Sequence, residues 1–311
     1  MTPVPPAGPT LAVVVNPVRR SAAHAVRAVR AASLAAGGGE PLVLETTPAE
    51  PGGPQARYAV RAGVRRVVVA GGDGTVREVA GALAGGETGL GVIPIGTANL
   101  FARSALLPLD DLRRSAASAV TGAARPTDLG EAVLTSGAGL VTRAPFLVVA
   151  GLGHDAATLA AVRPRAKAWL RWLAYFAPGL RRLGSPGHAL GVRLDGTDLA
   201  AGPLWSVLAV NAARLPAGAR VVPGARLDDG LLHVVLVSPR GPADWVRIAR
   251  TGLGRATSDR PGDHPSLRYR SGARLEVDAP EPVLAQVDGD VVPDVVAADL
   301  SVRPGALRVV R

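Results

Sequence analysis

The sequence predicts an N-terminal three-layer α/β domain with a parallel sheet, followed by a C-terminal β-sandwich domain with helical insertions. Three observations lead to this fold class. The length of 311 residues suits two domains. Up to about residue 126, short apolar runs alternate with helical patterns. Most later strands follow one another without an intervening helix, and Gly, Pro and Asp punctuate them. We expect the first domain to span 1–126, with 303–311 returning to it, and the second to span 127–302.

The first domain contains four continuous apolar runs, the pattern of strands that are buried on both faces of a parallel sheet. These runs are residues 11–15, 41–45, 66–70 and 90–95. Helical patterns follow at about 20–36 and 53–63, from about Thr75, and again after residue 95. The alternation predicts helices on both faces of the sheet.

The second domain has strand patterns separated by turns, which favours an antiparallel sheet. The predicted strands are residues 145–151, 188–195, 204–211, 231–237, 273–278, 283–288 and 307–311. Two helical insertions are expected, one near 155–183 and one near 241–254. The last strand is the segment expected to return to the first domain.

Charge and cysteine content favour some functions and exclude others. The formal net charge is +10, and Lys167 is the only lysine among 35 basic residues. An arginine-rich chain favours anionic partners such as phosphates or acidic lipid surfaces, although a GC-rich genome produces the same bias. The absence of cysteine excludes disulfides, thiol catalysis and thiolate metal sites.

The N-terminal segment lacks the basic and apolar regions of a signal peptide, and no apolar run reaches the length of a membrane-spanning helix. We therefore expect a cytoplasmic protein, with any membrane contact peripheral at the inner surface.

The segment Gly71-Gly72-Asp73-Gly74-Thr75 lies between a predicted strand and a predicted helix. Glycines allow backbone N–H groups to approach an anion, and a helix N-terminus favours negative charge. Thr75 and Glu78 have the spacing of a capping box. Asp73 would repel a phosphate directly, so a Mg²⁺ ion, a water network or an ordering role in the turn must explain it. A plain strand–helix turn is the alternative, since neither a P-loop nor a GxGxxG pattern is present.

Two further polar turns follow strands of the same predicted sheet. Residues 16–20, Asn-Pro-Val-Arg-Arg, come after the first strand, and Gly96-Thr97 come after the fourth. In a parallel sheet these turns share one edge with the glycine turn, and ligands of open α/β sheets bind at such edges. The three turns together predict a phosphate-binding site.

An ordered set of motifs resembles the diacylglycerol kinase catalytic domain family, which includes bacterial lipid kinases and sphingosine kinases and is distantly similar to NAD kinases. The motifs are NP at 16–17, GGDGT at 71–75, PIGTAN at 94–99, RPTDLGEA at 125–132, FLVVAGLGHDAAT at 146–158, VVPGARLDDGLLHVVLV at 221–237, QVDGD at 286–290 and VRPGALRVV at 302–310. Each motif is weak alone, but the set covers most of the chain.

The resemblance implies an ATP- and Mg²⁺-dependent enzyme that phosphorylates a lipid hydroxyl. It assigns the proton acceptor to Asp288, with Asp73 as a second catalytic acid. The nucleotide contacts that it implies are Asn16, Pro17, Val18, Arg19, Arg20, Thr46, Gly72, Asp73, Gly74, Thr75, Val76, Arg77, Glu78, Thr97 and Asp290. Phosphoryl transfer rests mainly on positioning and on charge neutralisation, and an acid-rich site suits oxygen-ligated Mg²⁺.

The resemblance also implies a metal site in the second domain, formed by Asp229 and the backbone oxygens of Arg226 and Leu231. Local sequence offers a simpler interpretation, because Asp-Gly at 229–230 and at 288–289 is a strong turn signal. The chain departs from the family at Leu100, where a carboxylate is common. That change puts the activity or the choice of acceptor in question.

Residues 162–183 combine four aromatic and six basic residues, with the aromatics at helical spacing. Such a segment resembles an interfacial helix on anionic lipid, and a helix that packs on the sandwich with a solvated basic face is the alternative. The five histidines show no metal or triad spacing. Net charge alone supports nucleic-acid binding, so we expect none.

The sequence thus favours a lipid kinase with a diacylglycerol-like or sphingoid-like acceptor. An NAD kinase-like enzyme is the enzymatic alternative, since it shares GGDG. A relative that binds nucleotide or membrane without catalysing transfer is the other. The sequence leaves the oligomeric state open, a homodimer included.

Overall fold

The computed structural model describes residues 10–156, 184–199, 202–211, 222, 224–253, 264 and 266–311. The chain forms two compact units, Met1–Thr127 with Gly305–Arg311, and Asp128–Pro304. The strands β5 (Ala124–Ser136) and β14 (Asp290–Val310) are long enough to begin in one unit and end in the other. Each unit is described by itself below.

The first unit contains a parallel sheet, as the sequence predicts. Its strands are β1 (Leu11–Val15), β2 (Leu42–Glu45), β3 (Arg66–Gly71) and β4 (Gly89–Pro94), and the end of β14 pairs beside β4. The order is β2-β1-β3-β4-β14, with every pairing parallel. Because β1, β3 and β4 are buried along almost their whole length, continuous apolar runs are the sequence pattern that they require.

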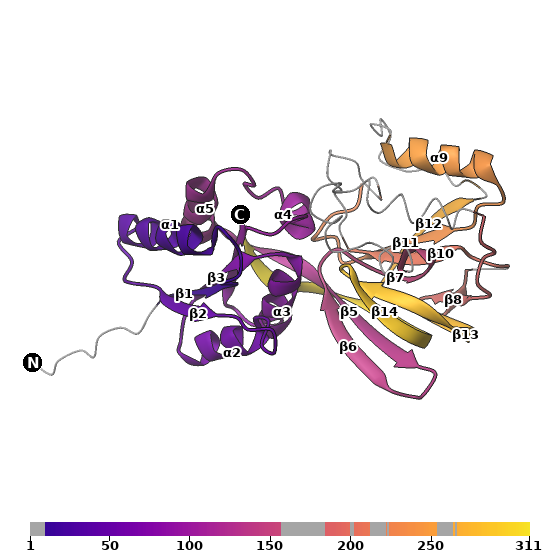
Figure 1. The fold of residues 1–311 in the computed structure, drawn as a ribbon, viewed down its shortest axis with the longest axis horizontal. Helices are drawn as coiled ribbons and strands as arrows, with labels where there is room; N and C mark the ends of the chain where they lie inside the picture. Colours follow the sequence, from indigo (N-terminus) through magenta and orange to yellow (C-terminus); the bar gives the residue numbers. More distant parts are fainter. Residues whose placement is uncertain are drawn as a thin grey trace, which may run out of the picture. The chain divides into compact units, whose positions relative to one another are not determined.

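Helices cover both faces of this sheet (Figure 1). The helices α1 (Ala22–Ala35) and α5 (Leu112–Thr121) share one core with the sheet. The helices α2 (Gly53–Arg61) and α3 (Asp73–Leu83) lie on the other side in Figure 1. A short helix, α4 (Leu100–Ser104), follows β4. One helix was expected after β4, but the structure has two, α4 and α5. Asp111 caps α5 by accepting the N–H groups of Arg113 and Arg114.

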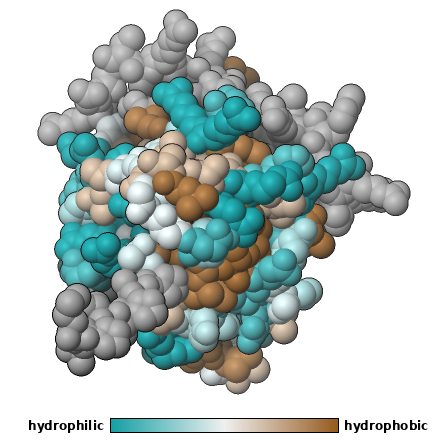
Figure 2. Space-filling model, turned by 90° about the vertical axis from the view of Figure 1, so that its left-hand side faces the viewer, coloured by the Kyte–Doolittle hydropathy of each residue, from teal (hydrophilic) through white to brown (hydrophobic). Residues whose placement is uncertain are grey.

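The edge strand β2 is short, and its residues Leu42, Val43 and Leu44 are half-buried. Figure 2 looks onto this side of the molecule and shows hydrophobic side chains in the middle of the face with hydrophilic ones around them. A four-residue edge offers few unpaired backbone groups to a second chain.

The second unit is antiparallel, again as predicted. Its main sheet has the order β12-β11-β10-β7-β13-β14. The elements of this unit not yet named are β6 (Val141–Phe146), β7 (Val149–Gly153), β8 (Gly191–Leu194), β9 (Thr197–Asp198), β10 (Ser206–Val210), β11 (Leu232–Val237), α9 (Pro242–Leu253), β12 (Leu267–Gly272) and β13 (Arg274–Val287). One apolar core contains buried side chains from β5 to β8, from β10 and β11, and from β13 and β14. The strand β5 pairs with β6 and β14.

The second unit differs from the sequence expectation in its strand boundaries. The two strands expected at 273–278 and 283–288 are one strand, β13, with register shifts between Asp278 and Ala285. Pro280 and Pro282 lie in this interval, and proline cannot donate to the ladder. The strand expected at 145–151 is instead two strands, β6 and β7, separated by Leu147 and Val148. The strands β5, β12 and most of β14 were not predicted.

The basic and aromatic segment 162–183 lies outside the described residues, so its predicted membrane contact stays a prediction. None of the described helices is both long enough and apolar enough to span a bilayer.

Candidate active site

Three turns meet at the carboxyl edge of the parallel sheet, where β1, β3 and β4 end. The N–H of Asn16 donates to the carbonyl of Ala70 at 3.0 Å, and the N–H of Ile95 donates to the carbonyl of Gly71 at 3.1 Å. The Asn16 side chain closes its own turn by accepting the N–H of Val18 at 3.2 Å. Hydrogen bonds of the sheet therefore continue into the turns and fix their positions.

The glycine turn and the turn after β4 touch through their backbones. A Cβ atom on Gly96 would lie 2.5 Å from the Cα of Gly72, so a side chain at Gly96 would force the turns apart. A Cβ atom on Gly72 would lie 3.3 Å from the guanidinium of Arg19. These distances bring an exposed cation from the first turn against the glycine turn. The predicted convergence of the three turns is therefore present.

The helix α3 begins at Asp73, with Gly72 as its N-cap residue. The capping box expected from Thr75 and Glu78 is wrong, because the helix starts two residues before Thr75. No side chain of the described residues caps α3. Thr75 is buried instead, and its Cβ lies 2.8 Å from where a Cβ on Gly71 would be. The start of α3 therefore has no side-chain cap in the described part of the chain, and a helix N-terminus of this kind favours an anion.

The Asp73 carboxylate orders the neighbouring turn. It accepts the N–H of Phe101 at the start of α4, with an Oδ1–N distance of 3.2 Å. Burial raises the pKa of Asp73, while hydrogen bonds from the N–H groups of Phe101, Leu100 and Asn99 act in the opposite direction. Of the roles left open by the sequence, the structure shows the ordering one directly. At Leu100, where the family commonly has a carboxylate, it is the backbone N–H that interacts with Asp73. A backbone N–H is present whatever the side chain.

The remaining predicted nucleotide residues differ in exposure. Gly74 and Thr97 are exposed, Val76 is buried, and Thr46 is buried at the end of β2 with its N–H on the Val15 carbonyl. Arg77 and Glu78 form an ion pair at 3.4 Å. Pro17, Val18 and Arg20 lie on the exposed first turn. The members of the set in the first unit lie at or next to the carboxyl edge of the parallel sheet, and the side chain of Val76 is buried there.

In the second unit, Asp288 lies in the hairpin turn between β13 and β14 with a φ of 48°. Its Oδ2 accepts the N–H of Leu147 at 2.7 Å, and its Oδ1 accepts those of Val148 and Val149 at 2.9 Å each. These donors explain the break between β6 and β7, because their N–H groups point to the carboxylate. Asp290 is exposed at the start of β14.

A hydrogen-bond network joins the β6–β7 break, where Asp288 binds, to the loop that carries Asp229. Asn211, fully buried, donates from Nδ2 to the carbonyls of Leu147 and Asp128 at 3.2 and 3.1 Å. The Asp128 carboxylate accepts the N–H of Gly230 at 2.7 Å. Neither Asn211 nor Asp128 was predicted as a site residue, although Asp128 is the acid of the Asp-Leu-Gly motif at 128–130.

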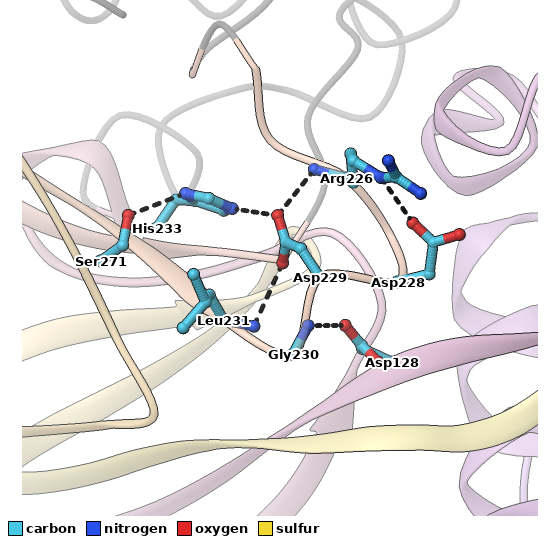
Figure 3. A network of polar contacts seen from close by, with 8 residues as sticks. All are labelled: Asp128, Arg226, Asp228, Asp229, Gly230, Leu231, His233 and Ser271. Atoms are coloured by element: carbon cyan, nitrogen blue, oxygen red, sulfur yellow. Dashed lines mark hydrogen bonds and ion pairs between the residues drawn. The ribbon is translucent and has the colours of Figure 1, made fainter.

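The loop from Arg226 to Leu231 surrounds Asp229 with hydrogen-bond donors (Figure 3). Its Oδ2 accepts from the N–H of Arg226 at 3.1 Å and from Nε2 of His233 at 2.9 Å, and its Oδ1 accepts the N–H of Leu231 at 3.1 Å. Burial alone would raise the pKa of Asp229. The hydrogen bonds and the charge of His233 outweigh this effect, so the pKa of Asp229 lies below its usual value.

This arrangement does not fit the metal site that the resemblance implies. A cation needs oxygen lone pairs, whereas Asp229 faces the positive ends of three donors. Among the described residues, no group of three or more His, Asp or Glu side chains could hold a metal ion. We therefore assign no metal to Arg226, Asp229 and Leu231.

Asp155, which follows β7 in the Gly-x-Gly-x-Asp-Ala motif, was also not predicted as a site residue. The residue is partly exposed, but its carboxylate is buried. Burial raises the pKa of Asp155 to about 6, although hydrogen bonds from Ser206, the N–H of Ala156 and Gln286 oppose the shift. Oδ1 has no hydrogen-bond partner among the described residues. A buried, half-satisfied acid of this kind is typical of a functional pocket.

Comparison with known proteins defines the class to which this fold and site belong. Residues 10–132 match the Diacylglycerol kinase catalytic domain, and residues 148–311 match the YegS C-terminal NAD kinase beta sandwich-like domain. The chain therefore belongs to the YegS-like lipid kinases of the diacylglycerol kinase family.

Individual relatives agree with this family. A Pseudomonas aeruginosa protein named "Probable lipid kinase YegS-like" is 36% identical over 255 residues, covering 81% of this chain and 78% of the relative. A Bacillus subtilis diacylglycerol kinase is 28% identical over 72% of this chain and 70% of its own. A crystal structure of a Bacillus anthracis diacylglycerol kinase has the same fold, with a TM-score of 0.70, 18% identity and 97% coverage of both chains. A yeast NADH kinase structure is more distant, with a TM-score of 0.51, 12% identity, and coverage of 97% of this chain and 82% of its own.

The raised pKa of Asp155 predicts how stability changes with pH. Between about pH 4 and about pH 6, the unfolded chain is ionised at this residue while the folded chain keeps the proton. Stability therefore falls as pH rises through this window, by about 3 kcal/mol in total, and levels off above it. In Asp155→Asn this loss is absent, so the variant gains stability over the parent at pH 8 but not at pH 4.

Denaturant unfolding across this pH range measures the difference. Asp278→Asn, which alters an exposed acid on β13, is the control and follows the parent profile. Parallel profiles for Asp155→Asn and the parent would show that the folded chain does not hold this proton.

Proposed function

We propose that this chain transfers the γ-phosphoryl group of ATP to the hydroxyl of a diacylglycerol-like or sphingoid-like lipid. The observation that carries the proposal is the edge of the parallel sheet, where the backbones of Gly72 and Gly96 touch beside Arg19 at the uncapped start of α3. Membership of the lipid kinase family supports ATP as donor and a lipid as acceptor.

The phosphates of ATP would bind at the start of α3. Backbone N–H groups there have no side-chain cap among the described residues, and the helix dipole favours negative charge. Gly74 is exposed, and a Cβ atom there would meet nothing within 4 Å, so open space lies over the first turn. Arg19 supplies a positive charge beside it. Mg²⁺ would accompany ATP as part of the substrate, which agrees with the oxygen-rich family motifs.

The roles of the two acids follow from their contacts. Asp73 holds the turn at Phe101, which favours a positioning role in the nucleotide site. Asp288 is the proposed acceptor of the proton from the lipid hydroxyl. The three N–H donors fix the position of its carboxylate and the direction in which it points. We retain 1–126 with 303–311 as the proposed nucleotide domain.

An NAD kinase-like activity is the second candidate, favoured by the shared fold of the yeast NADH kinase structure. The identity of 12% supports the fold alone, while the relatives above 30% identity carry lipid kinase names. A catalytically impaired relative has only Leu100 in its favour.

Replacing Gly74 by Ala tests the phosphate site without disturbing the fold. The new Cβ meets no atom within 4 Å, and Ala is favoured over Gly in a helix by about 0.5–1 kcal/mol, so Tm stays the same or rises slightly. The methyl group projects where phosphate approaches, so we expect ATP affinity to fall at least about tenfold. Calorimetric titration with ATP measures the change.

The matched control is Gly39→Ala, which also adds a methyl group in open space but lies before β2, at the other end of the sheet. It should bind ATP as the parent does. Parent-like ATP affinity in a folded Gly74→Ala variant would remove the start of α3 from the nucleotide site.

Replacing Asp288 by Asn tests the proton acceptor. An amide cannot take the proton, so we expect the rate of lipid phosphorylation to fall by about 10²–10⁴-fold. The amide N–H₂ also faces N–H donors of the β6–β7 break, so Tm falls too. The assay is therefore run at a temperature where the variant is folded, with ATP affinity as a second measurement. Retained ATP affinity with lost transfer supports the assignment, whereas a parent-like rate would refute it.

A further inference from the structure

We propose that His233 takes the place of a metal ion at Asp229, so that the loop from Arg226 to Leu231 is held without a divalent cation. The family resemblance leads one to expect a metal there, and the contacts of this chain oppose it. The proposal concerns the architecture of the second unit and stands independently of the proposed function.

The hydrogen bonds of Asp229 leave its carboxylate surrounded by donors. Arg226 and Leu231 were expected to turn their carbonyl oxygens toward a shared cation. Instead their N–H groups donate to the two carboxylate oxygens, each at 3.1 Å. His233 completes the set at 2.9 Å. A cation placed on this carboxylate would sit beside three positively polarised hydrogens, which is unfavourable.

His233 is well placed to be a permanent partner. It lies on β11 directly opposite Ser271 of β12, and its side chain is only 11% exposed. Nδ1 and the Ser271 hydroxyl are 3.0 Å apart, so both ring nitrogens are engaged (Figure 3). Neutral imidazole can accept from Ser271 while donating to Asp229, and imidazolium can donate to both. The ring therefore keeps both contacts in either charge state.

Two further side-chain contacts hold this loop in place. Gly230 donates to the Asp128 carboxylate at 2.7 Å, and the Arg226 guanidinium pairs with Asp228 at 2.9 Å. Backbone N–H groups of Arg226, Gly230 and Leu231 therefore all donate to carboxylates of this chain. A histidine that donates to a half-buried acid supplies the positive polarity that a cation would otherwise supply.

The test is the thermal unfolding of the full chain without nucleotide, in chelator and in excess Mg²⁺. We expect the same Tm in both conditions for the parent. His233→Leu keeps the apolar volume but removes the donor, and we expect Tm to fall by about 5 °C. The control is His24→Leu, the same substitution at an exposed histidine of α1, which should leave Tm near the parent value. Because no substrate is used, the result does not depend on the kinase activity.

Two outcomes would overturn the proposal. In the first, the Tm of the parent is lower in chelator than in Mg²⁺, and Asp229→Asn shows no such difference. The other is a His233→Leu variant as stable as His24→Leu, which would mean that the imidazole does not hold the loop. If Asp229→Asn does not fold, the second outcome still decides the question. A Mg²⁺ effect of equal size in the parent and in Asp229→Asn would support the proposal, because it would place the ion elsewhere.

Discussion

The turns of this protein depend on carboxylates that accept backbone N–H groups. Where a strand ends, its next N–H groups lose their ladder partners, and a buried N–H without an acceptor costs about 1–3 kcal/mol. Asp73 accepts the N–H of Phe101, Asp288 accepts three N–H groups at the break between β6 and β7, and Asp128 accepts that of Gly230. The acids in the motifs are thus also the residues that shape the turns.

This double use affects how the loss of an acid should be interpreted. Removing a carboxylate that holds several N–H groups disturbs the turn as well as any chemistry, so lost activity alone does not identify a catalytic group. A glycine with open space above it gives a cleaner probe, because a methyl group there blocks a ligand without breaking a protein contact. Gly74 and Gly96 differ in this respect, since only Gly96 lies against another backbone.

Much of the fold could be predicted from the sequence, and the failures have physical causes. Continuous apolar runs revealed the parallel strands, because burial on both faces leaves no other pattern. The break at Leu147 and Val148 could not be predicted, since it depends on Asp288, about 140 residues away in the chain. The capping box expected from Thr75 and Glu78 is absent because α3 begins at Asp73, two residues before Thr75, and the spacing of the two side chains does not fix where the helix begins.

The candidate site shows the same division. The alternation of strands and helices was enough to predict that the turns at Asn16, Gly72 and Thr97 share one edge, because the carboxyl ends of parallel strands lie at the same edge of a sheet. It could not show that Asp229 faces donors, because the decisive partner, His233, lies on a strand whose pairing with Ser271 the motif does not encode. Asp155 stood in a quoted motif, but its burial and its raised pKa required the fold.

The central claim is that ATP is the donor and a lipid hydroxyl the acceptor. The most direct test incubates the protein and Mg²⁺ with ATP labelled in the γ-phosphate, offering a total lipid extract in one reaction and NAD in the other. The account predicts label in the organic phase, in a species that mass spectrometry identifies as the phosphomonoester of a hydroxyl-bearing lipid, with no label in NADP. Label in NADP alone, or none in any lipid of a folded, ATP-binding preparation, would contradict it.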